Sequence, residues 1–193
     1  MADHSAAARR ASPFAEFPAD WGPTVAGLRL SEGGPAARFI LRGTDAVAVA
    51  SGAFGVAIPT TPLRAAAGAG RAALWLGPDE WLLLGPAGEA DALAASLAAA
   101  LADVPHSLVD VSHRQTGLVL EGPGAALALN AAVPLDLSLA AFPVGMAART
   151  IFEKAEIVLW RTDPERFHVE VWRSFAPYVR ELLDIVRREN AVA

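Results

Sequence analysis

The sequence predicts an α+β fold of two similar halves, each with the element order β-β-α-β-β-α and antiparallel sheets packed against helices. Three observations predict it. Short apolar runs end at turns rich in glycine, proline and acidic residues, as antiparallel strands do. The order of strands, short helix, irregular stretch, hairpin and closing helix occurs twice. Matching features recur at Gly43 and Gly122, at Trp75 and Trp160, and in the turns 78–80 and 163–165.

The first half is expected to cover residues 24–103. Its first two strands are separated by a turn at residues 32–35, where glycine and proline break the extended pattern. Thr44 or Asp45 can cap the short helix that follows. The expected elements are strands at 24–30 and 37–41, a short helix at 43–53, an irregular stretch at 58–63, a hairpin of strands 72–76 and 81–84, and a closing helix at 89–102.

The second half is expected to cover residues 106–188 in the same order. Its closing helix is amphipathic, with one apolar stripe made of Phe175, Val179, Leu182 and Val186. The expected elements are strands at 108–112 and 116–120, a short helix at 122–131, an irregular stretch at 134–143, strands at 146–152, 157–160 and 167–172, and a closing helix at 174–188.

A chain of 193 residues is long enough to bury a substantial core. We expect a flexible segment at residues 1–22, a single duplicated domain at residues 23–188 and a short tail at residues 189–193. The apolar share of 53% and the mean hydropathy of +0.34 are high for a free monomer, although alanine accounts for much of both. A subunit that buries further surface against partners would show the same bias.

Charge and composition exclude several classes of protein. A net charge of −5 and a pI near 5.3 give no basic surface for nucleic acid or for an anionic membrane. The longest apolar helix-like run, residues 90–101, is about half of the ~20 residues that a membrane span needs. Arg9-Arg10 lacks the apolar stretch of an export signal, and there is no cysteine. We therefore expect a cytoplasmic protein with no nucleic-acid and no membrane partner.

The local candidates for chemistry favour no active site. Asp110, Ser112 and His113 are the residue types of a hydrolase triad, but a strand would point the first two to one face and His113 to the other. We expect them to bond neighbouring backbone groups instead. The four histidines lack metal-ligand spacing, and the glycine patterns at 68–73 and 122–127 are interpreted as turns. The sequence thus predicts no catalytic residue, no cofactor-binding residue and no metal ligand.

Five tryptophans stand out beside a single tyrosine. Most are expected in the core. Tryptophan is also a typical anchor of protein interfaces, and alternation along a strand turns some side chains outward. We therefore expect at least one tryptophan to bury itself against a larger partner. The candidate interface or motif positions are Trp81, Trp160, Trp172, Asp110, His113 and Arg114.

The order of these motifs carries a specific resemblance. The motifs are Asp110-Val111-Ser112-His113 before a strand, Gly122-x-Gly124-x-x-Leu127 at a helix start, Leu135-x-Leu137, and Asp163-Pro164-Glu165 between the last two strands. In this order the chain resembles the folate-binding aminomethyltransferase fold. The segments 76–81, 110–114 and 142–145 most resemble the gamma-subunit family of heterotetrameric sarcosine oxidases, and the likeness covers roughly residues 24–188.

The resemblance implies a place in an enzyme that oxidatively demethylates sarcosine to glycine, with oxygen giving hydrogen peroxide. The released one-carbon unit passes to tetrahydrofolate. In such complexes the larger subunits hold FAD, FMN, NAD and the folate site, so no cofactor is expected in this chain. The implied partners are the alpha, beta and delta subunits, chiefly the large alpha subunit, and the implied role is structural.

One departure from the family pattern supports that role. Aminomethyltransferases carry a catalytic aspartate in a long turn between the strands that correspond to residues 148–152 and 157–160. Here the turn shrinks to Glu153-Lys154-Ala155-Glu156, which contains no aspartate. Two alternatives stay open, an independent folate-dependent aminomethyltransferase-like enzyme and a free-standing module that binds a small molecule.

Overall fold

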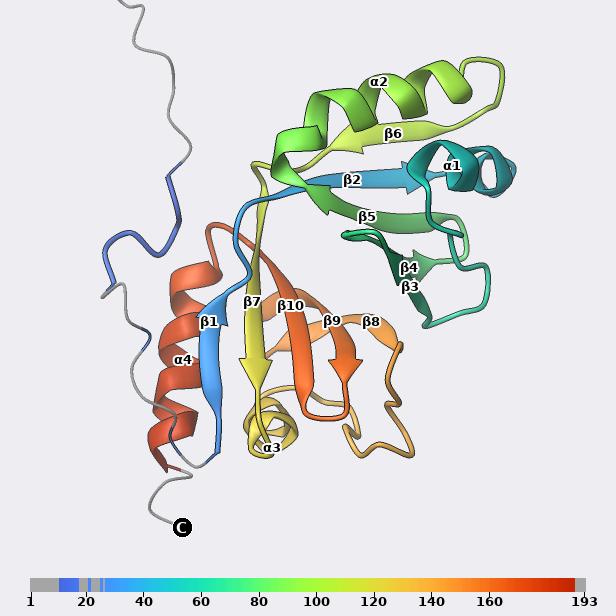
Figure 1. Ribbon diagram of the computed structural model, residues 1–193. Helices are drawn as coiled ribbons and strands as arrows, with labels where there is room; N and C mark the ends of the chain where they lie inside the picture. Colours follow the sequence, from blue (N-terminus) through green and yellow to red (C-terminus); the bar gives the residue numbers. More distant parts are fainter. Residues whose placement is uncertain (1–10, 18–20, 22–24, 26, 190–193) are drawn as a thin grey trace, which may run out of the picture.

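The computed structural model describes residues 11–17, 21, 25 and 27–189. These residues form two five-stranded antiparallel sheets that face each other, each with helices on its outer side (Figure 1). The first sheet has the order β3-β4-β5-β2-β6, with β3 at Ala65–Gly68, β4 at Arg71–Gly77, β5 at Glu80–Pro86, β2 at Ala36–Arg42 and β6 at Ser107–Asp110. The second has the order β1-β7-β10-β9-β8, with β1 at Arg29–Glu32, β7 at Gln115–Glu121, β10 at Arg166–Trp172, β9 at Ala155–Asp163 and β8 at Ala147–Phe152.

Three apolar cores hold these layers together. One lies between the first sheet and the helices α1, Ala46–Phe54, and α2, Ala90–Ala100, which a short 3-10 turn precedes. A second lies between the second sheet and the helices α3, Ala125–Asn130, and α4, Ala176–Glu189. The third joins the two sheets and includes Ile40, Leu74, Leu82, Ala147 and Val158. The central strands are therefore buried on both faces, which explains their nearly continuous apolar runs.

The predicted α+β class and the duplication are confirmed, but the first strands of the two halves are exchanged. β1 pairs with β7 of the second half, and β6 pairs with β2 of the first half. Figure 1 shows the chain crossing from one sheet to the other twice, between β1 and β2 and again between β6 and β7. Neither sheet is complete without a strand from the other half. The sequence prediction missed this exchange and also missed β3.

Gly43 and Gly122 show how closely the halves correspond. Both glycines end the second strand of their half, and their φ angles are +114° and +115°. The N–H of Gly43 donates to the carbonyl of Asp79, and the N–H of Gly122 donates to the carbonyl of Glu165. A Cβ atom would lie 2.9 Å from the Pro105 carbonyl oxygen at Gly43 and 2.0 Å from the Gly27 carbonyl oxygen at Gly122. In both places the absence of a side chain leaves room for the backbone of the segment that leads into the exchanged strand.

The apolar stripe of α4 differs from the predicted one. The buried apolar residues are Ala176, Val179, Leu183 and Val186, whereas Phe175 is 41% exposed. The helix begins at Ala176, and Phe175 lies in the preceding turn, where its N–H donates to the carbonyl of Trp172. The helix thus begins two residues after the predicted start at residue 174, which leaves Phe175 outside it, and Leu182 is only partly buried against the core.

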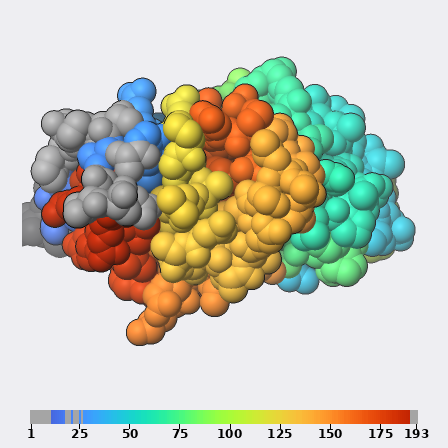
Figure 2. Space-filling model, turned by 90° about the horizontal axis from the view of Figure 1, so that it is seen from below, coloured from blue at the N-terminus to red at the C-terminus, as the bar shows by residue number. Residues whose placement is uncertain are grey.

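The two halves also meet along the segments 63–65 and 145–147. The N–H of Ala147 donates to the Leu63 carbonyl, and the N–H of Ala65 donates to the Gly145 carbonyl. Figure 2 shows this side of the molecule from below, with the halves in close contact. Of the segment predicted to be flexible, residues 1–10, 18–20 and 22 lie outside the described residues, whereas Phe14 is buried in the core of the second sheet. Residues 190–193 of the predicted tail also lie outside them.

Candidate functional site

The segment 110–114 forms a turn after β6 instead of continuing the strand. The Asp110 carboxylate accepts the N–H of Ser112 at 2.7 Å, and the Ser112 hydroxyl accepts the N–H of Arg38 at 2.8 Å. The prediction that these side chains bond backbone groups is confirmed for Asp110 and Ser112, although the group that Ser112 bonds is on β2 and is not its neighbour in the sequence. The His113 side chain is exposed and takes no part in these bonds. The segment therefore fixes the start of β7 against β2, and its three polar residues form no hydrolase triad.

The candidate tryptophans occupy three different environments. Trp81 is 1% exposed and its ring N–H donates to the Pro59 carbonyl at 2.7 Å, so it belongs to the core. Trp160 is half-buried and meets the His168 ring edge-on, with 6.1 Å between the ring centroids. Trp172 is 40% exposed at the end of β10. Of these three side chains, Trp172 offers the most surface to a partner.

Trp172 is part of an aromatic surface that we define by Trp172, Phe175, Tyr178 and Arg114. The three aromatic residues are 36–41% exposed and lie within seven residues at the junction of β10 and α4. The Arg114 guanidinium lies over the Trp172 ring, 5.3 Å from its centroid. Among the described residues, no carboxylate lies within 4 Å of that guanidinium. Aromatic residues and arginine are the types enriched at protein interfaces.

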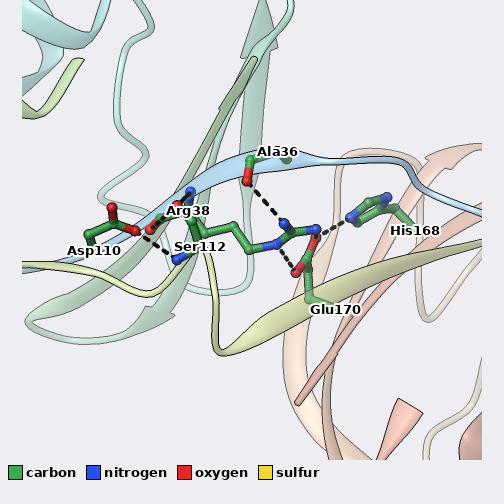
Figure 3. Close-up of polar contacts among 6 residues, drawn as sticks. All are labelled: Ala36, Arg38, Asp110, Ser112, His168 and Glu170. Carbon is green, nitrogen blue, oxygen red and sulfur yellow. Dashed lines mark hydrogen bonds and ion pairs between the residues drawn. The ribbon is translucent and has the colours of Figure 1, made fainter. Parts of the chain in front are cut away.

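A second group of polar residues lies between the two sheets (Figure 3). Arg38 of β2 makes a bidentate ion pair with Glu170 of β10, with Nε–Oε2 and Nη2–Oε1 distances of 2.6 and 3.0 Å. Nε2 of His168 lies 2.7 Å from the same Oε1 atom. The side chains of Arg38 and Glu170 are 3% and 0% exposed. This inter-sheet cluster of Arg38, His168 and Glu170 thus links the first sheet to the second through the buried ion pair of Arg38 and Glu170, with His168 18% exposed beside it.

Glu170 is held ionised inside this cluster. Burial alone would raise the pKa of its carboxyl group, but the hydrogen bond and charge of His168 and the charge of Arg38 outweigh burial and lower that pKa below its ordinary value. The opposing residue on β7 is Gly117. A Cβ atom there would lie 2.9 Å from Cε1 of His168 and 3.2 Å from Oε1 of Glu170. The missing side chain of Gly117 therefore makes room for the imidazole and the carboxylate.

A second ion pair connects the sheets at the other end of β5. Glu80 accepts hydrogen bonds from Arg42 of β2 at 2.7 Å and from Arg149 of β8 at 2.5 Å. The Glu80 side chain is 10% exposed, whereas the two arginines are 51% and 35% exposed. Because both arginines reach solvent, this pair is weaker than the inter-sheet cluster and more sensitive to salt.

Sequence reasoning missed Arg38 and Glu170, and it considered His168 as one of four histidines without metal-ligand spacing. One signal was present in the sequence. His168 and Glu170 are two residues apart on β10 and share a face, while Phe167, Val169 and Val171 occupy the other. A strand with such an apolar face in a duplicated fold lies in the middle of its sheet. Its polar face, which carries His168 and Glu170, must therefore also be covered. The partner, Arg38, could not be identified without knowing that the sheets stack.

Several kinds of site are absent from the described part of the chain. Residues 11–17, 21, 25 and 27–189 contain no group of three or more histidine and acidic residues placed to hold a metal ion. The connection between β8 and β9 is a tight turn of Glu153 and Lys154, because Phe152 pairs directly with Ala155. The glycine pattern at 68–73 marks a turn, as predicted, with Gly68 ending β3 and Gly70 in the turn before β4. No described helix is long and apolar enough to span a membrane.

Comparison with known proteins identifies a family. The family model described as "Sarcosine oxidase, gamma subunit family" matches residues 42–188. Sarcosine oxidase subunit gamma of Corynebacterium sp. (strain P-1) is 40% identical over 116 residues, which are 60% of this chain and 56% of that protein. The subunit of the same name from Corynebacterium sp. (strain U-96) is 36% identical over 151 residues, 77% of this chain and 73% of that protein. Sarcosine oxidase subunit gamma of Arthrobacter sp. is 38% identical over 128 residues, which are 66% of this chain and 62% of that protein. The match therefore spans less than two thirds of the proteins from Corynebacterium sp. (strain P-1) and Arthrobacter sp..

Solved structures agree with this result. A chain of the heterotetrameric sarcosine oxidase from Corynebacterium sp. U-96, in complex with pyrrole 2-carboxylate, superposes with a TM-score of 0.86 at 32% identity. The superposition covers 95% of this chain and 97% of that one. The glycine cleavage system aminomethyltransferase T from Bartonella henselae has a TM-score of 0.65 at 18% identity, over 83% of this chain and 46% of that one. The second likeness shows that the fold is shared with aminomethyltransferases.

Proposed function

Since the chain belongs to the sarcosine oxidase gamma subunit family, we propose that it is a structural subunit of a sarcosine oxidase complex. The observation that carries the proposal is the superposition over 97% of a chain from the heterotetrameric enzyme at a TM-score of 0.86. A match of that extent leaves little room for an additional catalytic insertion. In the proposed complex, sarcosine is oxidatively demethylated to glycine with formation of hydrogen peroxide, and the one-carbon unit passes to tetrahydrofolate.

We further propose that the chemistry belongs to the other subunits. The alpha, beta and delta subunits would hold FAD, FMN, NAD and the folate site, and the whole complex would work in the cytoplasm. The geometry of this chain supports that division. The turn at Glu153 and Lys154 is too short to present a catalytic loop. The side chains of Arg38 and Glu170 are 3% and 0% exposed and pair with each other, which suits a structural role.

The aromatic surface of Trp172, Phe175, Tyr178 and Arg114 is the proposed contact with a larger subunit. Each of the three aromatic residues is more than a third exposed, although soluble monomers seldom expose large contiguous apolar patches. Arg114 has no acidic partner among the described residues, so the proposed partner surface is apolar and supplies a carboxylate to that guanidinium. His113, which precedes Arg114 in the chain, and Asp110, four residues before Arg114, would contribute the polar rim.

Substitutions that place a charge on this surface test the proposal. Phe175→Glu combined with Tyr178→Glu should abolish co-purification of the tagged chain with its flavoprotein partners, because buried carboxylates would remain unpaired. The matched control is Leu127→Glu on α3, where the leucine is 62% exposed on another face. The control should co-purify as the wild type does, and both variants should keep the wild-type melting temperature. Co-purification of the double variant at wild-type yield would show that the partner binds elsewhere.

A further inference from the structure

A small pocket lies beside the two crossovers between the sheets, and no step of the proposed function uses it. Gly34 and Pro35 line it from the connection of β1 to β2, and Ser112 lines it from the connection of β6 to β7. Its volume is about 190 Å³, below the roughly 300 Å³ at which sites for drug-sized ligands begin. The pocket therefore has room for a molecule of only a few heavy atoms.

Polar side chains of this pocket are buried. Arg38, Ser112, Gln115 and Thr116 all line it and are 2–6% exposed. Buried polar groups are normally hydrogen-bonded, and two of these side chains follow that rule. Arg38 pairs with Glu170, and the Ser112 hydroxyl accepts the N–H of Arg38. The side chain of Gln115, by contrast, has no such partner.

The carboxamide of Gln115 makes no hydrogen bond with any described residue, and its Oε1 atom is buried without a partner. A carboxamide carries two N–H donors and one acceptor oxygen, and an unpaired buried one destabilises the fold. Since no described residue fixes this carboxamide, it can turn its NH2 group or its oxygen toward the pocket without a change of shape. The pocket therefore contains a buried hydrogen-bonding group that the described part of the chain leaves unsatisfied.

Arg173 adds to this pocket a charge that no described carboxylate neutralises. Its Nη2 atom donates to the carbonyl of Ala11, which also lines the pocket, and its guanidinium belongs to none of the ion pairs of the described residues. The backbone N–H of Arg173 donates to the carbonyl of Arg114, which precedes Gln115 in the chain. Trp172, which precedes Arg173, is the register partner of Gln115. The guanidinium and the carboxamide therefore line one pocket from the end of β10 and the start of β7.

These groups define the ligand. A guanidinium and an NH2 group both donate hydrogen bonds, and a carboxylate accepts several at once through its two oxygens. No acidic side chain of the described residues lines the pocket, so an anion meets no like charge there and a cation finds no counter-charge. Ala11, Gly34 and Pro35 form an apolar part of the wall, which suits a short carbon chain. A carboxylate of a few heavy atoms fits these features.

We propose that this pocket binds a small monocarboxylate, whose oxygens accept hydrogen bonds from the Arg173 guanidinium and from the NH2 group of Gln115. Its carbon part packs against Ala11 and Pro35. The ligand neutralises the free guanidinium and gives the Gln115 carboxamide the partner that the described residues do not supply. The four residues of the aromatic surface do not line the pocket, so the site lies beside that surface and is not part of it.

Gln115 is the only glutamine in the sequence, so its side chain supplies a site-specific signal. The test uses the full chain labelled with ¹⁵N in the glutamine side chain. Acetate that replaces chloride at constant ionic strength should shift the single carboxamide signal saturably. Acetamide has nearly the shape of acetate without its charge. It should bind about tenfold more weakly, because hydrogen bonds to a charged acceptor are roughly twice as strong as neutral ones.

Arg173→Met tests the charge, and Arg114→Met is its matched control. The Arg114 guanidinium also has no acidic partner among the described residues, but it lies over the Trp172 ring and does not line the pocket. Arg173→Met should weaken acetate binding about tenfold or more, whereas Arg114→Met should leave the affinity close to that of the wild type. If Arg173→Met does not fold, the comparison of acetate with acetamide on the wild-type chain still decides.

Three results would overturn the site. One is the absence of a saturable shift of the Gln115 carboxamide when acetate replaces chloride. Another is equal binding of acetate and acetamide, because the charge of the ligand would then be irrelevant. The third is an equal loss of acetate binding in Arg173→Met and Arg114→Met, which would indicate a general attraction of anions to the surface. Failure of this test leaves co-purification with the flavoprotein subunits unaffected.

Discussion

Replacing Glu170 alone should destabilise the protein far more than replacing Glu170 and Arg38 together. The ion pair is bidentate, with distances of 2.6 and 3.0 Å, and its side chains are 0% and 3% exposed. In Glu170→Leu the guanidinium stays buried without a counter-charge, which costs about 3–5 kcal/mol. In the double variant Arg38→Met/Glu170→Leu both charges are gone, and stability should return to within about 1 kcal/mol of the wild type or exceed it.

Urea unfolding of the full chain, followed by tryptophan fluorescence at pH 7, measures these differences. A double-mutant cycle with Arg38→Met as the other single variant then gives the interaction energy of the pair, which should exceed about 2 kcal/mol. Coincident transitions by fluorescence and circular dichroism establish that the unfolding is two-state. The reasoning is refuted if Glu170→Leu costs less than about 1 kcal/mol, or if the two single effects simply add in the double variant.

Three further predictions follow from the same contacts. Gly117→Ala should lower the unfolding free energy by about 1–3 kcal/mol in the same urea assay, because the added Cβ would lie 2.9 Å from the His168 ring. The control is Gly68→Ala, whose added Cβ would meet nothing within 4 Å. It should leave the unfolding free energy unchanged or slightly raised. Glu80→Gln should lower the unfolding free energy by about 1–2 kcal/mol at low salt and by less at 1 M NaCl, because the arginine partners of Glu80 reach solvent. An equal loss at both salt concentrations would contradict this prediction. The lowered pKa of Glu170 stabilises the folded protein above about pH 4, and this stability is lost as the pH falls through the pKa that Glu170 has in the folded state. The wild type should therefore lose more unfolding free energy between about pH 7 and pH 3 than the Arg38→Met/Glu170→Leu variant. Equal losses in the two proteins would contradict the lowered pKa of Glu170.

The duplication was visible in the sequence because its markers are local. Gly43 and Gly122 are glycines because their φ angles are positive and because a Cβ atom at either position would collide with the backbone packed against it. The hairpins at 77–80 and 163–165 are defined by turn residues alone. The exchange of β1 and β6 left no comparable signal, because strand pairing between halves depends on contacts between residues far apart in the sequence, such as Leu30 with Leu120 and Ile40 with Val109.

The candidate site was only partly predictable for a related reason. The tight turn at Glu153 and Lys154 and the backbone bonds of Asp110 follow from spacing, and both were predicted correctly. The inter-sheet cluster depends on how the sheets stack, which brings Arg38 and Glu170 together from 132 residues apart. The exposed position of Phe175 was missed because the helix begins two residues later than predicted, which leaves Phe175 in the preceding turn.

The central claim is that this chain serves an oxidase as a structural subunit. Size-exclusion chromatography with light scattering tests it most directly, on the tagged chain expressed alone and with the flavoprotein subunits from the same source. We expect the co-expressed chain to elute in one stoichiometric complex that absorbs as a flavoprotein and produces hydrogen peroxide from sarcosine, and the chain alone to produce none. A chain that remains a monomer of about its own mass, 20.1 kDa, in the presence of those subunits would contradict the claim.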